Sequence, residues 1–282
     1  KYPLDTVHNY NMLTEDFLPL YDMIKVLDLD KKKKIKGLSA QRADILPAAL
    51  AVIKAFVTYM HVENFTISGA GLREGIMFNQ ALPSTIEKPV SDVLNYSLTT
   101  LVKWYDCDEK HVEHVVNLSI QLFKQLRVLH KFPRQYLKVL KVAATLHDCG
   151  MRIKYYNHQR HSWYMILNAN LYGVTHREIV LAAFTACCHK KEDINPLDWA
   201  RFKDILRDED IEIVKRLGVM LRIAESLDRS MSGCIKGINC DILGDSVIMK
   251  TEVEGDATLE IRDAMAAGAE FKKSFHKNLE IL

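Results

Sequence analysis

Apolar residues recur at helical spacing through almost all of residues 85–240, and this pattern limits the possible folds more than any other feature. The segment 112–126 is typical, because its apolar residues fall three or four positions apart: Val112, Val115, Val116, Leu122, Phe123 and Leu126. The segments 134–148 and 210–230 show the same spacing. It collects apolar side chains on one helix face, which must be buried against another element. We therefore expect an all-helical domain over residues 85–240.

Signals for helix ends support this interpretation. Ser91 and Asp108 are plausible N-caps, and Thr175 with Glu178 three residues later makes a capping box. Gly150 follows an apolar helical segment, and glycine is the usual residue at a helix end.

The N-terminal part mixes helix and strand. Thr14 can cap a helix, and Pro47 suits the first turn of another, where the missing N–H would be unpaired anyway. The run FTIS (65–68) predicts a strand, which leads into a second helical start. Residues 1–84 are therefore expected to be an α/β segment.

From residue 241 apolar and polar residues alternate. SVIMKTEVE (246–254) and TLEIRD (258–263) are predicted to be strands, followed by a short helix at 266–277 and a strand at 278–282. The expected fold class is mainly α with α/β ends. Its three domains are residues 1–84, 85–240 and a small α+β subdomain at 241–282.

Composition excludes several classes of function. A chain of 282 residues is too long for one ordinary core. The net charge of +2 gives no reason to expect nucleic acid binding, and no apolar run is long enough to span a bilayer. The six cysteines lack CxxC spacing, which favours reduced thiols in a cytoplasmic protein.

The run LHDCG (146–150) places His147 and Asp148 side by side after an apolar helix. Buried charge is costly unless it is paired or coordinates a metal. More histidines and acids lie on the neighbouring expected helices: His111, His114, His158, His161, His189, Glu225 and Asp228. Helical bundles build metal sites from such inward-facing side chains, and imidazole with carboxylate suits zinc, manganese or iron.

Structural roles are an open alternative. His111 is expected to face solvent, and His158 can simply cap a helix. The residues Arg222, Glu225 and Arg229 can form an exposed charge ladder that contributes little to stability. In this interpretation His147 and Asp148 form a hydrogen-bonded pair inside the bundle.

The order His114, His147-Asp148 and a later acid in LRIAES (221–226) resembles the HD superfamily of metal-dependent phosphohydrolases. The resemblance implies the ligand set His114, His147, Asp148, His161, His189 and Glu225. Glu225 stands where that superfamily has aspartate, and its extra methylene moves the carboxylate by more than about 1 Å. We therefore expect weak or substoichiometric binding of a divalent metal, which Glu225→Asp would strengthen.

A second resemblance covers the whole chain. Six motifs occur in the order typical of the exopolyphosphatase and guanosine pentaphosphate phosphatase (Ppx/GppA) family: GLSAQRADILPAALAVIKAF, TISGAGLREG, LHDCG, NHQRHSWYMI, CHKK and LRIAESLDRS. The resemblance implies two actin-like domains, an HD-like helical domain and a small C-terminal domain. Residues 1–84 would be the tail of the second actin-like domain, with the catalytic glutamate and the first phosphate loops upstream of Lys1.

The same resemblance implies an activity for the full-length protein. It would use Mg²⁺ to release terminal phosphate from polyphosphate or guanosine pentaphosphate, and it would act as a homodimer. Two alternatives remain: a stand-alone metal-dependent HD phosphohydrolase, and a catalytically silent nucleotide-sensing or dimerisation module. In each case the helical domain is expected to bring His114, His147 and Asp148 within ligand distance.

The N-terminal segment also offers candidate anion-binding residues. Gly69 and Gly71 lie at a strand-to-helix turn, where the backbone can approach a phosphate closely. Arg42 and Arg73 add donors that can bind phosphate oxygens. The alternative for each arginine is a salt bridge with a neighbouring acid, Asp44 or Glu74.

Overall fold

A computed structural model describes residues 2–83, 89–190 and 194–282. The chain forms two compact units. The smaller unit is Thr6–Leu82, and the larger combines the first residues, up to Asp5, with Pro83–Leu282. The expected boundary between residues 84 and 85 lies outside the described residues. The separate status of residues 241–282 stays a prediction.

The smaller unit pairs two short strands with helices. Strand β1 (Tyr10–Leu13) runs antiparallel to β2 (Asn64–Ile67), with Tyr10 opposite Ile67. The helices are α1 (Thr14–Val26), α2 (Leu29–Lys32), the 3-10 turn η1 (Ala40–Arg42), α3 (Leu46–Tyr59) and α4 (Leu72–Ala81). The predicted strand at FTIS and the predicted place of Pro47 in the first turn of α3 are confirmed.

Thr14 differs from its predicted role as a cap. It is the first residue of α1, and its hydroxyl donates a hydrogen bond to the carbonyl oxygen of Val62 at 2.6 Å. The residue ahead of Thr14, Leu13, is still part of strand β1. The Thr14 hydroxyl therefore does not cap α1 but links its start to the segment before β2.

Apolar side chains of the smaller unit are largely exposed. Phe17, Ile24 and Val57 are buried between α1 and α3, and Phe17 packs edge-on against Phe65. Other apolar side chains on its helices and turns are more than half exposed: Met23, Val26, Ile45, Val52, Phe56, Tyr59, Met60, Leu72, Ile76 and Met77. Little apolar area is thus removed from water, which limits the stability of this unit in the chain.

We expect the backbone amides of α3 to exchange with deuterium roughly ten-fold faster or more than those of the helix Gln135–Leu146 in the larger unit. Local stability follows the apolar area that a segment buries, and α3 buries only Val57. Hydrogen exchange read by mass spectrometry compares the two helices within one sample. Equal protection of both helices would contradict this prediction.

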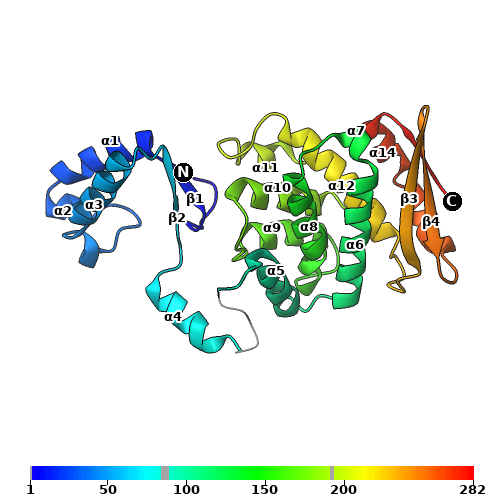
Figure 1. Cartoon of the computed structure of the whole chain (residues 1–282), viewed down its shortest axis with the longest axis horizontal. Coiled ribbons are helices and arrows are strands. Elements are labelled where there is room, and N and C mark those ends of the chain that lie inside the picture. Colours follow the sequence, from blue (N-terminus) through cyan, green and yellow to red (C-terminus); the bar gives the residue numbers. More distant parts are fainter. Residues whose placement is uncertain (1, 84–88, 191–193) are drawn as a thin grey trace. The chain divides into compact units, whose positions relative to one another are not determined.

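The larger unit is a helical bundle with a small sheet (Figure 1). In its described part the helical elements before the sheet are α5 (Val93–Trp104), α6 (Glu109–Gln125), α7 (Arg127–His130), α8 (Gln135–Leu146), η2 (Cys149–Arg152), α9 (His158–Leu167), α10 (His176–Cys187), α11 (Pro196–Ala200) and α12 (Asp210–Ser226). Helix α8 packs against α5, α6, α10 and α12, and its C-terminal half is buried. The coarse fold class predicted from the sequence, mainly α with α/β ends, is confirmed, whereas the actin-like and HD-like assignments stay predictions.

The helix N-termini test the N-cap residues that were predicted from the sequence. The side chain of Asp108 accepts a hydrogen bond from the N–H of His111, and Thr175 with Glu178 forms the predicted capping box. The prediction for Ser91 is wrong, because the next residue, Asp92, caps α5. Among the described residues, none of the helices is both long enough and apolar enough to cross a bilayer.

The C-terminal residues complete the larger unit. Strand β3 (Ile235–Leu243) pairs antiparallel with β4 (Ser246–Val253), which pairs parallel with β5 (Asn278–Ile281). Helices α13 (Thr258–Met265) and α14 (Gly268–Phe275) connect β4 to β5 and pack on α12. The predicted strand at residues 246–254, the helix within 266–277 and the closing strand are confirmed.

Two predictions for this region are wrong. TLEIRD is helical: α13 begins at Thr258, whose backbone N–H and hydroxyl donate hydrogen bonds to the Asp256 carboxylate just ahead of the helix. Strand β3 begins inside the segment expected to be helical. It lies beside α6 (Figure 1), whose Gln121 side chain accepts a hydrogen bond from the N–H of Ile238.

Candidate metal centre

His147 and Asp148 lie where the buried helix α8 ends. The imidazole of His147 is fully buried, and the Asp148 side chain is 10% exposed. The chain then turns through η2, which begins at Cys149, and the N–H of Gly150 in this turn donates to the Ser162 hydroxyl on α9 at 2.9 Å. This turn holds α9 close to the end of α8, with the first residue of α9, His158, beside Asp148.

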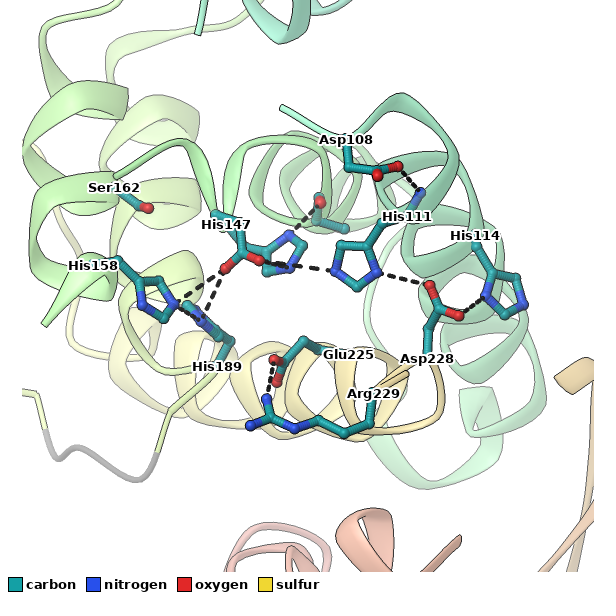
Figure 2. Close-up of polar contacts among 12 residues, drawn as sticks. Asp108, His111, His114, His147, His158, Ser162, His189, Glu225, Asp228 and Arg229 are labelled. Atoms are coloured by element: carbon teal, nitrogen blue, oxygen red, sulfur yellow. Dashed lines mark hydrogen bonds and ion pairs between the residues drawn. The ribbon is translucent and has the colours of Figure 1, made fainter. Parts of the chain in front are cut away.

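Four imidazole rings direct their Nε2 atoms at the Asp148 carboxylate (Figure 2). Oδ2 lies 3.8 Å from Nε2 of His111 and 3.5 Å from Nε2 of His147. Oδ1 lies 3.1 Å from Nε2 of His158 and 3.6 Å from Nε2 of His189. The rings come from α6, the end of α8, α9 and the residue that follows the end of α10. One carboxylate therefore stands between two pairs of histidines.

The opposite nitrogen of each ring, Nδ1, faces an acceptor. His147 faces the carbonyl oxygen of Ala144 and His158 that of Tyr155, both at 2.8 Å, and His189 faces that of Ala186. A carbonyl oxygen can only accept, so Nδ1 of each of these rings carries a proton, and Nε2 is the nitrogen left to face Asp148 or a metal.

The fourth ring is oriented in the same way by a side chain. Nδ1 of His111 lies 2.7 Å from Oδ2 of Asp228, whose other oxygen lies 2.9 Å from Nδ1 of His114. Metal-binding histidines are oriented in this way, by a carbonyl or carboxylate on the nitrogen that does not bind the metal.

The Nε2 atoms of the cluster lie close to one another, and one of them lacks a hydrogen bond within the described residues. Nε2 of His158 and Nε2 of His189 are 3.1 Å apart. Within the described residues, no hydrogen bond reaches Nε2 of His147, although it is fully buried. Such an atom is costly without a partner, and a cation would provide one.

Among the residues that the structure describes, two groups of ligand atoms meet the spacing of a metal site. One is His111, His147 and Asp148, and the other is Asp148, His158 and His189. In each group the candidate ligand atoms lie within 4.8 Å of one another. Imidazole nitrogens with one carboxylate suit a divalent transition metal. The residues present therefore fit a metal, with Asp148 common to both groups.

The ionisation of Asp148 and His189 suits the binding of a metal cation. Burial opposes ionisation of Asp148, but the neighbouring rings of His147 and His158 outweigh it and hold the carboxyl pKa well below its usual range. Burial, reinforced by His147, lowers the pKa of His189 to about 3. Asp148 is thus ionised and His189 neutral at pH 7, as metal ligation requires. Burial lowers the pKa values of His111 and His158, but their hydrogen bonds to Asp228 and Asp148 outweigh it and raise them, so a metal would have to displace a proton from these two rings.

The structure brings together only some of the predicted ligands. His147, Asp148 and His189 belong to the two groups, whereas the structure does not bring His114 into either. Nε2 of His114 lies 2.7 Å from the carbonyl oxygen of Ile235, so this ring joins Asp228 to the start of β3. His161 lies on α9 one turn beyond His158, outside both groups.

Glu225 also lies outside both groups. It is buried on α12, and its Oε1 lies 2.7 Å from Nζ of Lys190 and 3.4 Å from Nη1 of Arg229. The exposed charge ladder proposed for Arg222, Glu225 and Arg229 is wrong, because Glu225 is only 6% exposed and Arg222 pairs with Glu270 instead.

Two other expectations are wrong. His111 is 5% exposed, not solvent-facing, and its ring lies on the same buried stripe of α6 as Val115, Leu118 and Leu122. That spacing of four, seven and eleven residues was a signal in the sequence. The expected hydrogen bond between His147 and Asp148 is absent, since their 3.5 Å separation leaves Nε2 without a hydrogen bond within the described part of the chain.

The predicted anion-binding residues belong to the smaller unit. Gly71 precedes α4, and its N–H donates to the Glu74 carboxylate at 2.8 Å, so the protein's own acid lies at this helix N-terminus. The N–H of Gly69 donates to Nδ1 of His8. Arg42 ends η1, and Arg73 lies in the first turn of α4, both exposed. Their role in phosphate binding stays a prediction.

Comparison with known proteins places both parts of the chain in one family. Residues 1–84 match the Ppx/GppA phosphatase family, and residues 93–262 match Ppx/GppA phosphatase, domain III.

Curated relatives agree with this assignment. A protein of Aeromonas salmonicida named guanosine-5'-triphosphate,3'-diphosphate pyrophosphatase is 29% identical over 143 residues, 50% of this chain and 28% of the relative. Proteins of the same name from Aliivibrio fischeri and Pseudoalteromonas translucida are 29% and 26% identical over 55% and 61% of this chain, and 29% and 33% of their own lengths. The chain thus spans about a third or less of these relatives. Since the domain III match alone covers more than half of its residues, the chain belongs to the Ppx/GppA phosphatase family.

Proposed function

We propose that the protein containing this chain hydrolyses phosphoanhydride bonds and releases terminal phosphate from guanosine pentaphosphate or polyphosphate. The observation that carries this proposal is the match of residues 1–84 and 93–262 to the same phosphatase family. The names of the relatives support a guanosine nucleotide as substrate. Residues 1–84 would be the tail of an actin-like domain whose catalytic glutamate and Mg²⁺ site lie elsewhere in a cytoplasmic, homodimeric enzyme.

A second candidate function rests on the histidine cluster. Four Nε2 atoms around one carboxylate support an HD-like phosphohydrolase site in the larger unit. A divalent cation there would supply Lewis-acid chemistry to a phosphoryl oxygen. His111, His147, His158, His189 and Asp148 would hold it. Asp228 would orient His111, and Ala144, Tyr155 and Ala186 would fix the other three rings. A silent sensing or dimerisation module is the third possibility.

We expect the 282-residue chain with Mg²⁺ to release no measurable phosphate from long-chain polyphosphate or guanosine pentaphosphate. Phosphoryl transfer depends on cations and donors placed around the transferred group, and the family's phosphate loops are expected outside this chain. Phosphate release is measured for the chain and for a protein extended by the two actin-like domains, with Mg²⁺ and then Mn²⁺. Activity of only the extended protein supports the first proposal.

The variant His147→Ala separates the first two candidates. Turnover by the chain alone that His147→Ala abolishes, and that the exposed-site control His276→Asn retains, would establish the second candidate in place of the first. Activity of the extended protein that survives His147→Ala would assign the chemistry to the actin-like domains and leave the cluster a structural or sensing role.

A further inference from the structure

His114 lies beside the histidine cluster, and both nitrogens of its ring face oxygen atoms. It lies on α6 one turn beyond His111 and belongs to neither group of candidate ligands. Its Nε2 lies 2.7 Å from the carbonyl oxygen of Ile235, and its Nδ1 lies 2.9 Å from Oδ1 of Asp228 (Figure 2). The ring is thus held at both nitrogens between α6 and the residues that follow α12.

These two contacts determine the charge of His114. A carbonyl oxygen can only accept, so Nε2 carries a proton. In a neutral ring Nδ1 would then direct its lone pair at a carboxylate oxygen 2.9 Å away, and the two would repel each other. A proton on Nδ1 makes this contact an ion pair, so the geometry indicates an imidazolium. The contact with Asp228, which favours the charged form, also raises the pKa of His114.

Asp228 transmits this contact to the candidate ligand His111. Its Oδ2 lies 2.7 Å from Nδ1 of His111, and its Oδ1 also accepts a hydrogen bond from the N–H of Gly233 at 3.0 Å. A carboxylate turns about the bond to its carboxyl carbon unless both of its oxygens are held. The Asp228 side chain is 2% exposed, so protein contacts and not bulk water hold it. Without the imidazolium of His114, the carboxylate would therefore hold the ring of His111 less firmly.

The two metal groups found among the described residues differ in what orients their rings. The α6 group consists of His111, His147 and Asp148, and the α9 group consists of Asp148, His158 and His189. Backbone carbonyl oxygens orient both rings of the α9 group. In the α6 group the ring of His111 is oriented by a side chain, that of Asp228, which can turn. A change at His114 should therefore alter the orientation of a ring in the α6 group and not in the α9 group.

We propose that His114 is a positioning residue of the candidate metal centre, which fixes the ring of His111 through Asp228 and so favours metal binding at the α6 group. This proposal rests on the second candidate function, the HD-like site. Loss of the His114 charge would by itself favour a cation at both groups, because Coulomb attraction has no preferred direction and the groups share Asp148. Loss of orientation weakens the α6 group alone. The ratio of the two affinities therefore separates positioning from charge.

The experiment is long-range proton–nitrogen NMR of the full chain with labelled histidines, in Zn²⁺ buffered by a chelator. The ring nitrogens report which of them carries a proton or a metal. At pH 7 and without metal, we expect protons on both nitrogens of His114. In His114→Gln, the Zn²⁺ concentration that half-saturates His111 should rise about ten-fold relative to the concentration that half-saturates His158. His276→Gln is the control, because His276 is exposed in the same unit, and it should leave this ratio unchanged.

Three outcomes would overturn the proposal. One is a single protonated nitrogen on His114 in the metal-free chain, a measurement that needs no variant. The second is an unchanged ratio in His114→Gln although zinc binds, which would leave His114 a structural role and retain the metal centre. The third is zinc binding to none of the candidate rings, which would reject the second candidate function as well.

Discussion

Asp148→Asn is expected to lower the affinity of the chain for Mn²⁺ or Zn²⁺ by at least about 100-fold. Its carboxylate belongs to both ligand groups, so the substitution removes a ligand charge from each. Loss of an outer partner of a metal ligand already costs about 10–100-fold, and Asp148 would be a ligand itself. Asparagine keeps the volume of the side chain, which separates lost charge from lost packing. Competition with a chromogenic chelator measures the affinity, and metal analysis measures the stoichiometry.

Asp245→Asn is the matched control, because the Asp245 side chain is 97% exposed. It should bind metal as the unmodified chain does. Equal affinities for the Asp148 variant and the unmodified chain would contradict the assignment. If the unmodified chain is incubated with excess metal and then retains no ion, the four histidines serve the fold alone.

Glu225→Asp tests whether the later acid is a ligand. The sequence predicts that this change strengthens metal binding. In the structure Lys190 and Arg229 both contact the Glu225 carboxylate, so we expect the metal affinity to stay within about three-fold of the unmodified chain. A marked gain in affinity would return Glu225 to the ligand set.

Helices were predictable from the sequence where long apolar patterns and capping residues agree. Asp108 and the Thr175–Glu178 box mark the starts of α6 and α10 as predicted. TLEIRD was misassigned because two apolar residues in alternation, Leu259 and Ile261, fit a strand or one turn of a helix equally well. The hydrogen bonds that Thr258 donates to the Asp256 carboxylate, just ahead of α13, are local contacts that the alternation does not reveal.

The site was predictable only in part, because its geometry depends on contacts between distant helices. His147 and Asp148 are neighbours in sequence and mark the centre of the cluster. Asp228 bonds to His111 across 117 residues and also contacts His114, so the packing of α12 against α6 orients both rings of α6. The sequence spacing of His111 and His114 alone does not show which of them is the better candidate for a metal ligand. Burial does, and it favours His111.

Gly150→Ala is expected to lower the free energy of unfolding of the larger unit by about 3 kcal/mol or more. An added Cβ would lie 2.2 Å from the carbonyl oxygen of His158 and 2.4 Å from the backbone nitrogen of Ser162. Both are backbone atoms of α9, so no side-chain rotation relieves the contact, and α9 must move away from η2. Chemical denaturation followed by the helical circular dichroism signal measures the change.

Gly150→Ala should weaken metal binding by Asp148, His158 and His189 more than binding by His111, His147 and Asp148. Movement of α9 carries His158 away from Asp148, whereas His111 and His147 belong to α6 and to the end of α8. Gly268→Ala is the control in the same unit, because no atom lies within 4 Å of its added Cβ. We expect that control to stay within about 1 kcal/mol of the unmodified chain. Equal unfolding midpoints for both variants would mean that η2 and α9 are not packed as closely as the structure shows, and that Gly150 does not set the position of His158.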